Sequence, residues 1–193
     1  NNQVVVEAPA APLFAPEQLP VQLSIVPLQN SRSLSLNFPL PTMFPHWQKK
    51  PANYLAALLG HEGEGSLLEA LKVRGWAEGL SAGTGLEDRG GALFYVDISL
   101  TPAGLAHQSE IVEMFFATVQ LIAQQGINKW RYLETAQLSE IAFQFQEKQN
   151  PMGYVSMLSS KMQRYPIQKV LHANYVMNEF DAELLGSVVA QLS

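Results

Sequence analysis

The sequence predicts an α+β fold, with an antiparallel sheet covered on one face by helices. Period-two alternation of apolar and polar residues comes early in the chain, and helical spacing of apolar residues dominates its second half. No internal repeat is visible. At 193 residues, 47% of them hydrophobic, the chain is long enough to bury a substantial core, and one domain is the simplest interpretation.

The beginning of the chain is predicted to be an extended lead-in over residues 1–20. This segment is rich in proline and alanine and ends with Pro16 and Pro20. Proline neither donates to a strand ladder nor fits inside a helix. We therefore expect a single domain over residues 21–193.

Strands are expected where apolar and polar residues alternate or where small residues follow one another. The segment 39–51 holds four prolines and should be an irregular loop. The predicted strands are Val21–Ile25, Leu34–Phe38, an edge strand over Trp76–Thr84, and Ala92–Leu100, which shows the clearest alternation.

Helices are expected where apolar residues recur at i, i+3, i+4 and i+7. Two short helices should meet at the glycine-rich corner 60–65, with Gly75 as a stop signal. The predicted helices begin near Asn53 and near Leu67, carry apolar faces at Ile111–Ile122 and Leu138–Phe145, and cover Gly153–Arg164 and Asp181–Leu192.

Composition excludes several classes of function. The formal net charge is −5 and the few basic residues are scattered, which argues against nucleic-acid binding. No apolar run reaches the roughly 18 residues of a membrane span. The absence of cysteine rules out disulfides and thiolate metal sites but leaves the compartment open.

Zinc hydrolysis is worth testing because His61 and Glu62 resemble the start of a metal motif. Both H-E-x-x-H and H-x-x-E-H need a second histidine on the same helical face, and the others are distant: His46, His107 and His172. An ordinary helix-to-helix turn explains the corner instead. An independent hydrolase built on His61 and Glu62 would take up zinc in calorimetry.

The sequence supports neither nucleotide binding nor a serine nucleophile. The segments Gly83–Gly85 and Gly63–Ser66 match neither phosphate-binding glycine motif, and Glu62 and Glu64 would repel an anion. No G-x-S-x-G stands at a strand-to-helix turn.

Peptide binding is the functional alternative that the residues leave open. An edge strand of small residues over Leu80–Thr84 leaves backbone donors and acceptors free for strand addition. Glu62 would suit the amino terminus of the peptide. An ordinary edge strand that ends in a glycine-rich loop explains the same residues, and both interpretations stay open.

A long stretch over residues 53–76, which includes Gly60-His61-Glu62-Gly63-Glu64-Gly65-Ser66-Leu67-Leu68, closely resembles the second domain of the insulinase/pitrilysin zinc metallopeptidases. The resemblance extends through Leu36–Pro41, Leu100–Leu105, Ile141–Phe145 and Tyr165–Ile167. It leaves out only the first twenty or so residues. It implies a metallopeptidase-type α+β domain that lacks the catalytic residues, with H-x-x-E-H and zinc in another domain of the parent chain.

The resemblance also implies a substrate-binding site. In the family, a corner and a strand form an exosite that anchors the amino-terminal end of a peptide substrate. On this chain the matching residues are Gly60, Glu62, Leu80, Ser81 and Ala82. No catalytic or metal-binding residue is expected here.

The implied partners are peptide substrates and the neighbouring domains of the same chain, without nucleic acid or a membrane span. The family domain continues with another strand after Leu192, so we expect a domain truncated at its C-terminus. Bacterial relatives are often periplasmic. A scaffold or assembly subunit, from a catalytically inactive relative, is the alternative function, and an upstream H-x-x-E-H would decide between the two.

Overall fold

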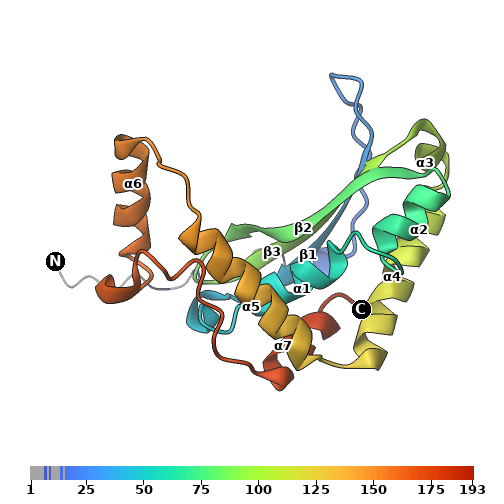
Figure 1. The fold of residues 1–193 in the computed structure, drawn as a ribbon. Coiled ribbons are helices and arrows are strands. Elements are labelled where there is room, and N and C mark those ends of the chain that lie inside the picture. Colours follow the sequence, from blue (N-terminus) through green and yellow to red (C-terminus); the bar gives the residue numbers. More distant parts are fainter. Residues whose placement is uncertain (1–6, 8, 10–13, 15) are drawn as a thin grey trace.

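The structure is a computed structural model that describes residues 7, 9, 14 and 16–193. Within these residues the chain forms a three-stranded antiparallel sheet in the order β1-β3-β2 (Figure 1). The strands are β1 (Ser33–Leu40), β2 (Ala77–Glu87) and β3 (Ala92–Leu100). The α+β class is thereby confirmed, and β3 has the predicted bounds.

Helices make up most of the remaining described chain. In the described residues they are η1 (Pro16–Gln18), η2 (Phe44–His46), α1 (Pro51–Leu59), α2 (Leu67–Val73), α3 (Pro102–Ala106), α4 (Gln108–Gln125), α5 (Lys129–Gln144), α6 (Pro151–Lys161), η3 (Ile167–Lys169) and α7 (Ala182–Ala190). None of them is both long and apolar enough to cross a membrane, as far as the described residues go.

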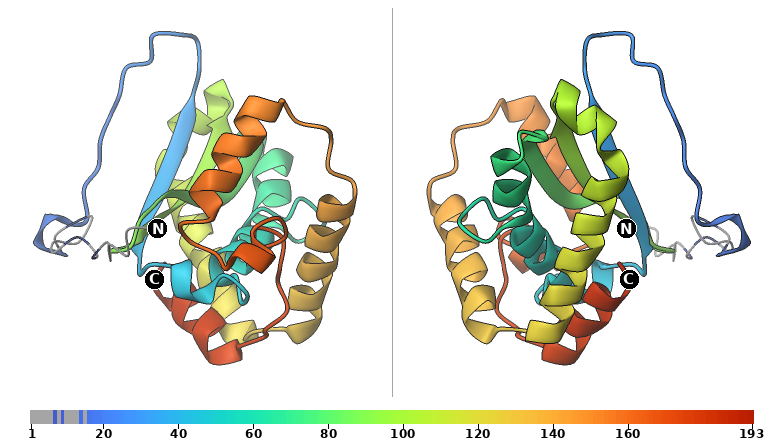
Figure 2. Two further views of the ribbon diagram at one scale, coloured as in Figure 1. Left: turned by 90° about the vertical axis from the view of Figure 1, so that its left-hand side faces the viewer. Right: turned by 90° about the vertical axis from the view of Figure 1, so that its right-hand side faces the viewer.

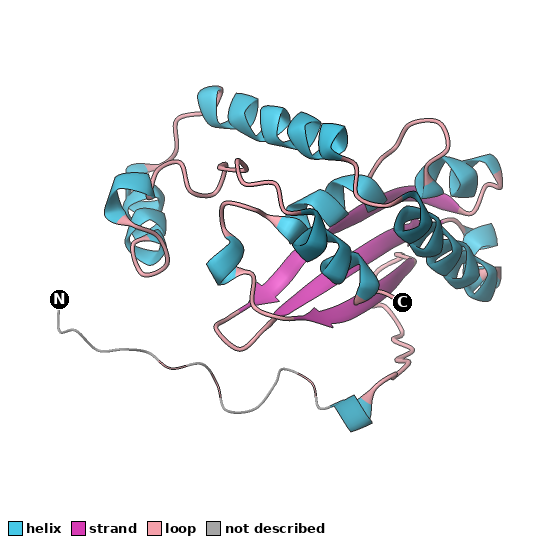
Figure 3. Ribbon diagram, turned by 90° about the horizontal axis from the view of Figure 1, so that it is seen from below, coloured by secondary structure: helices cyan, strands magenta, loops and turns pink. Residues whose placement is uncertain are grey.

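One face of the sheet carries the core. Along β3, residues at every second position are buried while their neighbours are more exposed, as period-two alternation requires. Helices α1, α2, α4 and α7 supply the apolar side chains that pack on the buried face (Figures 2 and 3). Phe94 of β3 and Phe115 of α4 lie at its centre, both 0% exposed.

A second, smaller cluster attaches the C-terminal segment to α1. Tyr54 of α1 and Tyr132 of α5 are buried together with Met177 and Leu185. The backbone carbonyl of Gln48 accepts hydrogen bonds from the Asn178 amide at 3.0 Å and the Tyr132 hydroxyl at 3.4 Å. Burial of that hydroxyl raises the pKa of Tyr132 to about 12.

The predicted strand at Val21–Ile25 is wrong. This segment is irregular, and Val21, Leu23 and Ile25 are 65%, 77% and 82% exposed. The chain there stands away from the sheet (Figure 2). Alternation gives a strand only where a neighbouring strand supplies hydrogen-bond partners, and among the described strands β1 pairs with β3 alone.

Helix α5 forms as predicted, but its apolar stripe is not buried. Leu138, Ile141 and Phe145 are 62%, 43% and 77% exposed. The helix packs on α1 and is buried only at Tyr132 in its first turn, and its far end leads out towards α6 (Figure 1). The predicted lead-in over residues 1–20 lies largely outside the described residues, and its described part contains η1.

Candidate functional site

Strand β2 forms an edge of the sheet. It pairs with β3 on one side, and no strand of the described residues pairs with it on the other. Its register is regular from Gly79 to Thr84, between one irregularity at Ala77/Gly79 and another at Thr84/Glu87. An edge of this kind offers a row of backbone donors and acceptors to an incoming strand.

The predicted residues Leu80, Ser81 and Ala82 lie at the middle of the regular stretch. Leu80 and Ala82 pair with Ile98 and Val96 and pack on the core, while Ser81 is exposed on the other face of the sheet. Their side chains therefore do not project along the edge. What this strand can offer a peptide is its backbone.

The other two predicted residues, Gly60 and Glu62, lie on the corner between α1 and α2, and both helices pack against β2. The Gly60 amide donates to the Ala56 carbonyl at 2.8 Å, and a Cβ at Gly60 would lie 2.9 Å from that oxygen. A glycine is thus needed there for local packing. The Glu62 side chain is 70% exposed, with Oε2 3.9 Å from Lys72 Nζ.

The interpretation of this corner as a helix-to-helix turn is confirmed. Ser66 lies at the N-cap of α2 in an extended conformation, and its Oγ accepts a hydrogen bond from the Glu69 amide at 3.1 Å. This contact satisfies one of the free amides at the start of the helix.

Replacing Ser66 with alanine is expected to lower the free energy of unfolding by about 1 kcal/mol, because the Glu69 amide loses its acceptor. Urea unfolding of the chain measures this change. Ser24→Ala is the matched control, since Ser24 lies in the exposed irregular segment. Equal unfolding midpoints for the two variants would contradict the capping role.

The histidines do not come together. His107 lies 3.0 Å from Glu110 and stacks on Trp76, and His172 lies 2.9 Å from Glu140. The His107 and His172 hydrogen bonds lower the pKa of Glu110 and Glu140 respectively. The described residues contain no group of three or more His, Asp or Glu side chains placed to hold a metal ion.

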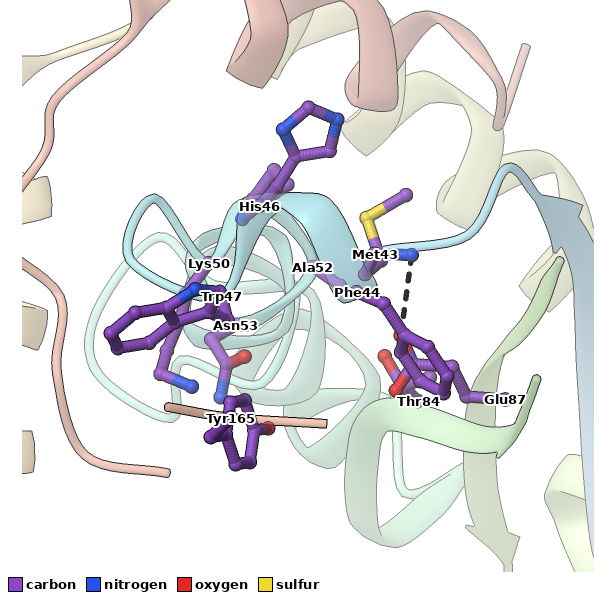
Figure 4. Close-up of a pocket in the computed structure, with 11 residues that line it drawn as sticks. Met43, Phe44, His46, Trp47, Lys50, Ala52, Asn53, Thr84, Glu87 and Tyr165 are labelled. Carbon is purple, nitrogen blue, oxygen red and sulfur yellow. Dashed lines mark hydrogen bonds between the residues drawn. The ribbon is translucent and has the colours of Figure 1, made fainter. Parts of the chain in front are cut away.

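A cavity of about 100 Å³ lies beside the far end of β2 (Figure 4). Thr84 and Glu87 of β2 line it together with Lys50, Trp47 and Tyr165. Residues distant in sequence thus share one cavity.

Local backbone geometry fixes the position of Lys50. This residue precedes Pro51 at the start of α1 and has φ 44° and ψ 56°, the left-handed conformation that non-glycine residues rarely adopt. In Figure 4 its ammonium group and the Asn53 side chain are directed towards Tyr165, whereas the His46 ring points away. Sequence reasoning missed this site because neither Lys50 nor Glu87 belongs to a motif.

Burial dominates the electrostatics of the cavity. The pKa of Lys50 is lowered to about 8, mainly by burial; the Glu87 carboxylate opposes this shift and the nearby Lys161 charge adds to it. Burial also raises the pKa of Glu87, against the influence of Arg164 and a 3.2 Å hydrogen bond from the Met43 amide to Oε1.

The fold and the site define a class: an α+β domain with an open sheet edge and without a metal-ligand cluster in its described part. The family described as "Peptidase M16 inactive domain" matches residues 5–138, and "Middle or third domain of peptidase_M16" matches residues 143–193.

Similar proteins and a similar solved structure belong to the same family of peptidases. The chain is 36% identical to "Insulin-degrading enzyme-like 1, peroxisomal" of Arabidopsis thaliana over its whole length and 20% of the relative's length. It is 35% identical to human "Insulin-degrading enzyme" over its whole length and 19% of that relative. The crystal structure of pitrilysin superposes with a TM-score of 0.81 at 25% identity, covering 84% of this chain and 18% of pitrilysin.

The chain belongs to the insulinase/pitrilysin family of M16 peptidases and is one of its non-catalytic domains. It spans about a fifth of the length of the curated relatives that it matches.

Proposed function

We propose that this chain is the non-catalytic domain of a zinc metalloendopeptidase, where it forms part of the substrate chamber and anchors peptide amino termini by strand addition. The regular edge of β2 over Gly79–Thr84, with which no further strand of the described residues pairs, is the observation that carries the proposal. A peptide strand on this edge would gain backbone hydrogen bonds without any specific side-chain pairing.

The five predicted site residues have different roles in this proposal. Leu80, Ser81 and Ala82 present the backbone that pairs with the peptide, and Gly60 shapes the adjacent corner. Glu62 supplies a negative charge for the peptide ammonium group, in place of its loose contact with Lys72. Zinc and water activation belong to another domain of the parent enzyme, and anchoring makes the reaction there effectively intramolecular.

Neighbouring domains of the same chain are the second partner. Large apolar side chains stand exposed along α5, and exposed apolar area of this extent favours burial against another surface. They are Trp130, Leu133, Leu138, Ile141 and Phe145.

The test is Glu62→Ala in the full-length enzyme. We expect kcat/KM to fall about threefold for peptides with a free amino terminus, because an exposed ion pair contributes modestly, and to stay unchanged for acetylated peptides. Glu64→Ala, a change in the same exposed loop, is the control. An equal loss for free and acetylated peptides would refute the anchoring role.

The alternative, a scaffold subunit of a catalytically inactive relative, predicts no cleavage by the unaltered full-length protein. Peptide binding without turnover, together with a missing H-x-x-E-H, would favour it.

A further inference from the structure

The cavity beside the end of β2 has an excess of positive charge. Lys50 lines it, and Lys161 and Arg164 lie close enough to change the pKa of Lys50 and of Glu87 respectively. Among the described residues that line it, Glu87 is the only carboxylate, and its Oε1 already accepts a hydrogen bond from the Met43 amide.

The cations lack carboxylate partners. Within the described residues, neither the Lys50 nor the Lys161 ammonium group has a carboxylate oxygen within 4.0 Å. The Arg164 guanidinium lies 4.2 Å from the centroid of the Phe44 ring, and it makes no ion pair with any described residue. Lys50 is half-buried and Lys161 is buried, whereas Arg164 is exposed, and a buried or half-buried cation without a counter-ion favours an anionic ligand.

The cavity also lies where the two family matches meet. Its walls come from the inactive-domain match, through Lys50 and Glu87, and from the middle-domain match, through Tyr165. Trp47 and Tyr165 contact each other across this junction, with ring centroids 5.6 Å apart. Junctions between structural units are common places for ligand pockets.

We propose that this cavity binds a single carboxylate group of a peptide, with Lys50 as its main contact and Arg164 as supporting charge. The small volume and the Glu87 carboxyl in the wall favour a singly charged group over a phosphate. Thr84, which ends the regular part of β2, also lines the cavity, so that the site continues the edge offered to a peptide. The statement that the carboxylate belongs to a peptide rests on the proposed function; the binding of a carboxylate in the cavity does not.

The experiment uses the full-length enzyme and peptides that are acetylated at one end and amidated at the other. Each carries glutamate or glutamine at one position, which is varied along the peptide. We expect glutamate to be favoured about tenfold in kcat/KM at one position at pH 7, as for one charge-assisted hydrogen bond. A glutamine peptide with a free carboxyl terminus separates a side-chain carboxylate from a terminal one.

Three variants are expected to change the preference for glutamate in different directions. Lys50→Gln abolishes the preference, Glu87→Gln increases it several-fold, and Lys169→Gln, an exposed change on η3, leaves it unaltered. The preference also falls as pH rises through about 8, where Lys50 loses its proton. Unfolding midpoints of all variants are recorded, and Arg164→Gln, which should weaken the preference, replaces Lys50→Gln if that variant fails to fold.

A second measurement is independent of turnover. Trace acetylation of Lys50 with acetic anhydride, read by mass spectrometry, should slow in the presence of the glutamate peptide and not of the glutamine peptide. The proposal is wrong if no carboxylate is preferred at any position or terminus, or if the preference survives Lys50→Gln. If the preference holds while Glu62→Ala affects free and acetylated peptides alike, the cavity stands and the anchoring of amino termini fails.

Discussion

Replacing Gly104 with alanine is expected to lower the free energy of unfolding by about 3 kcal/mol or more, because the added methyl group has no space. A Cβ at this position would overlap the carbonyl oxygen of Trp76 and lie 2.8 Å from its carbonyl carbon. Both atoms belong to the backbone and cannot move aside by a side-chain rotation.

The surroundings of Gly104 hold that carbonyl in place. The Thr101 amide donates to the Trp76 carbonyl at 3.1 Å, and the Thr101 hydroxyl donates to the Gly75 carbonyl at 2.6 Å. The same hydroxyl oxygen accepts from the Gly104 amide at 3.0 Å, and His107 stacks on Trp76 at 4.5 Å. Relief of the overlap would break this corner between α2, β2 and α3.

Urea unfolding of the chain measures the effect. Gly153→Ala is the control, because Gly153 lies in α6 and a methyl group added there would meet no atom within 4 Å beyond the backbone of its own helix. Alanine in a helix should be neutral or stabilising. A Gly104→Ala midpoint equal to that of the unaltered chain would contradict the packing argument.

Two variants are compared, Ser81→Pro and Ala82→Pro, at neighbouring positions of β2. One of the two is expected to reduce kcat/KM for peptides at least tenfold while the fold stays intact. In an antiparallel strand, successive residues direct their backbone groups to opposite sides. One of the two therefore bonds to β3, and the other faces the open edge. Proline lacks the donor and is tolerated in a sheet only on the unpaired side of an edge strand.

The two variants control each other. The proline that interrupts pairing with β3 should lower the unfolding midpoint of the full-length protein. The other proline should leave the midpoint close to normal and impair cleavage through the lost backbone contact. Strand addition would be ruled out if the well-folded variant cleaved every peptide at the normal rate.

Much of the fold was predictable from local patterns. Ala92–Leu100 alternates along its whole length and became β3 with the predicted bounds, because the central strand has partners on both sides. The cap at Ser66 follows from a serine three residues before Glu69 at the start of an apolar helical run. The family resemblance likewise rests on contiguous residues.

The same kind of pattern misled at Val21–Ile25, where alternation met no strand to pair with. At Leu138–Phe145 helical spacing predicted the helix correctly, but its apolar side chains remain exposed. In both cases the local pattern did not show whether a partner strand or an apolar surface of the described chain would cover the segment.

The sequence by itself determined the class of the fold, the central strand, the start of α2 and the lack of a zinc motif, because each depends on residues that are neighbours in the sequence. Only the tertiary structure decided that β2 lies at the edge of the sheet that the described residues form, and that Lys50, Glu87 and Tyr165 line one cavity. Sheet order and the packing of distant segments arise from contacts across the whole core, and no local spacing encodes them.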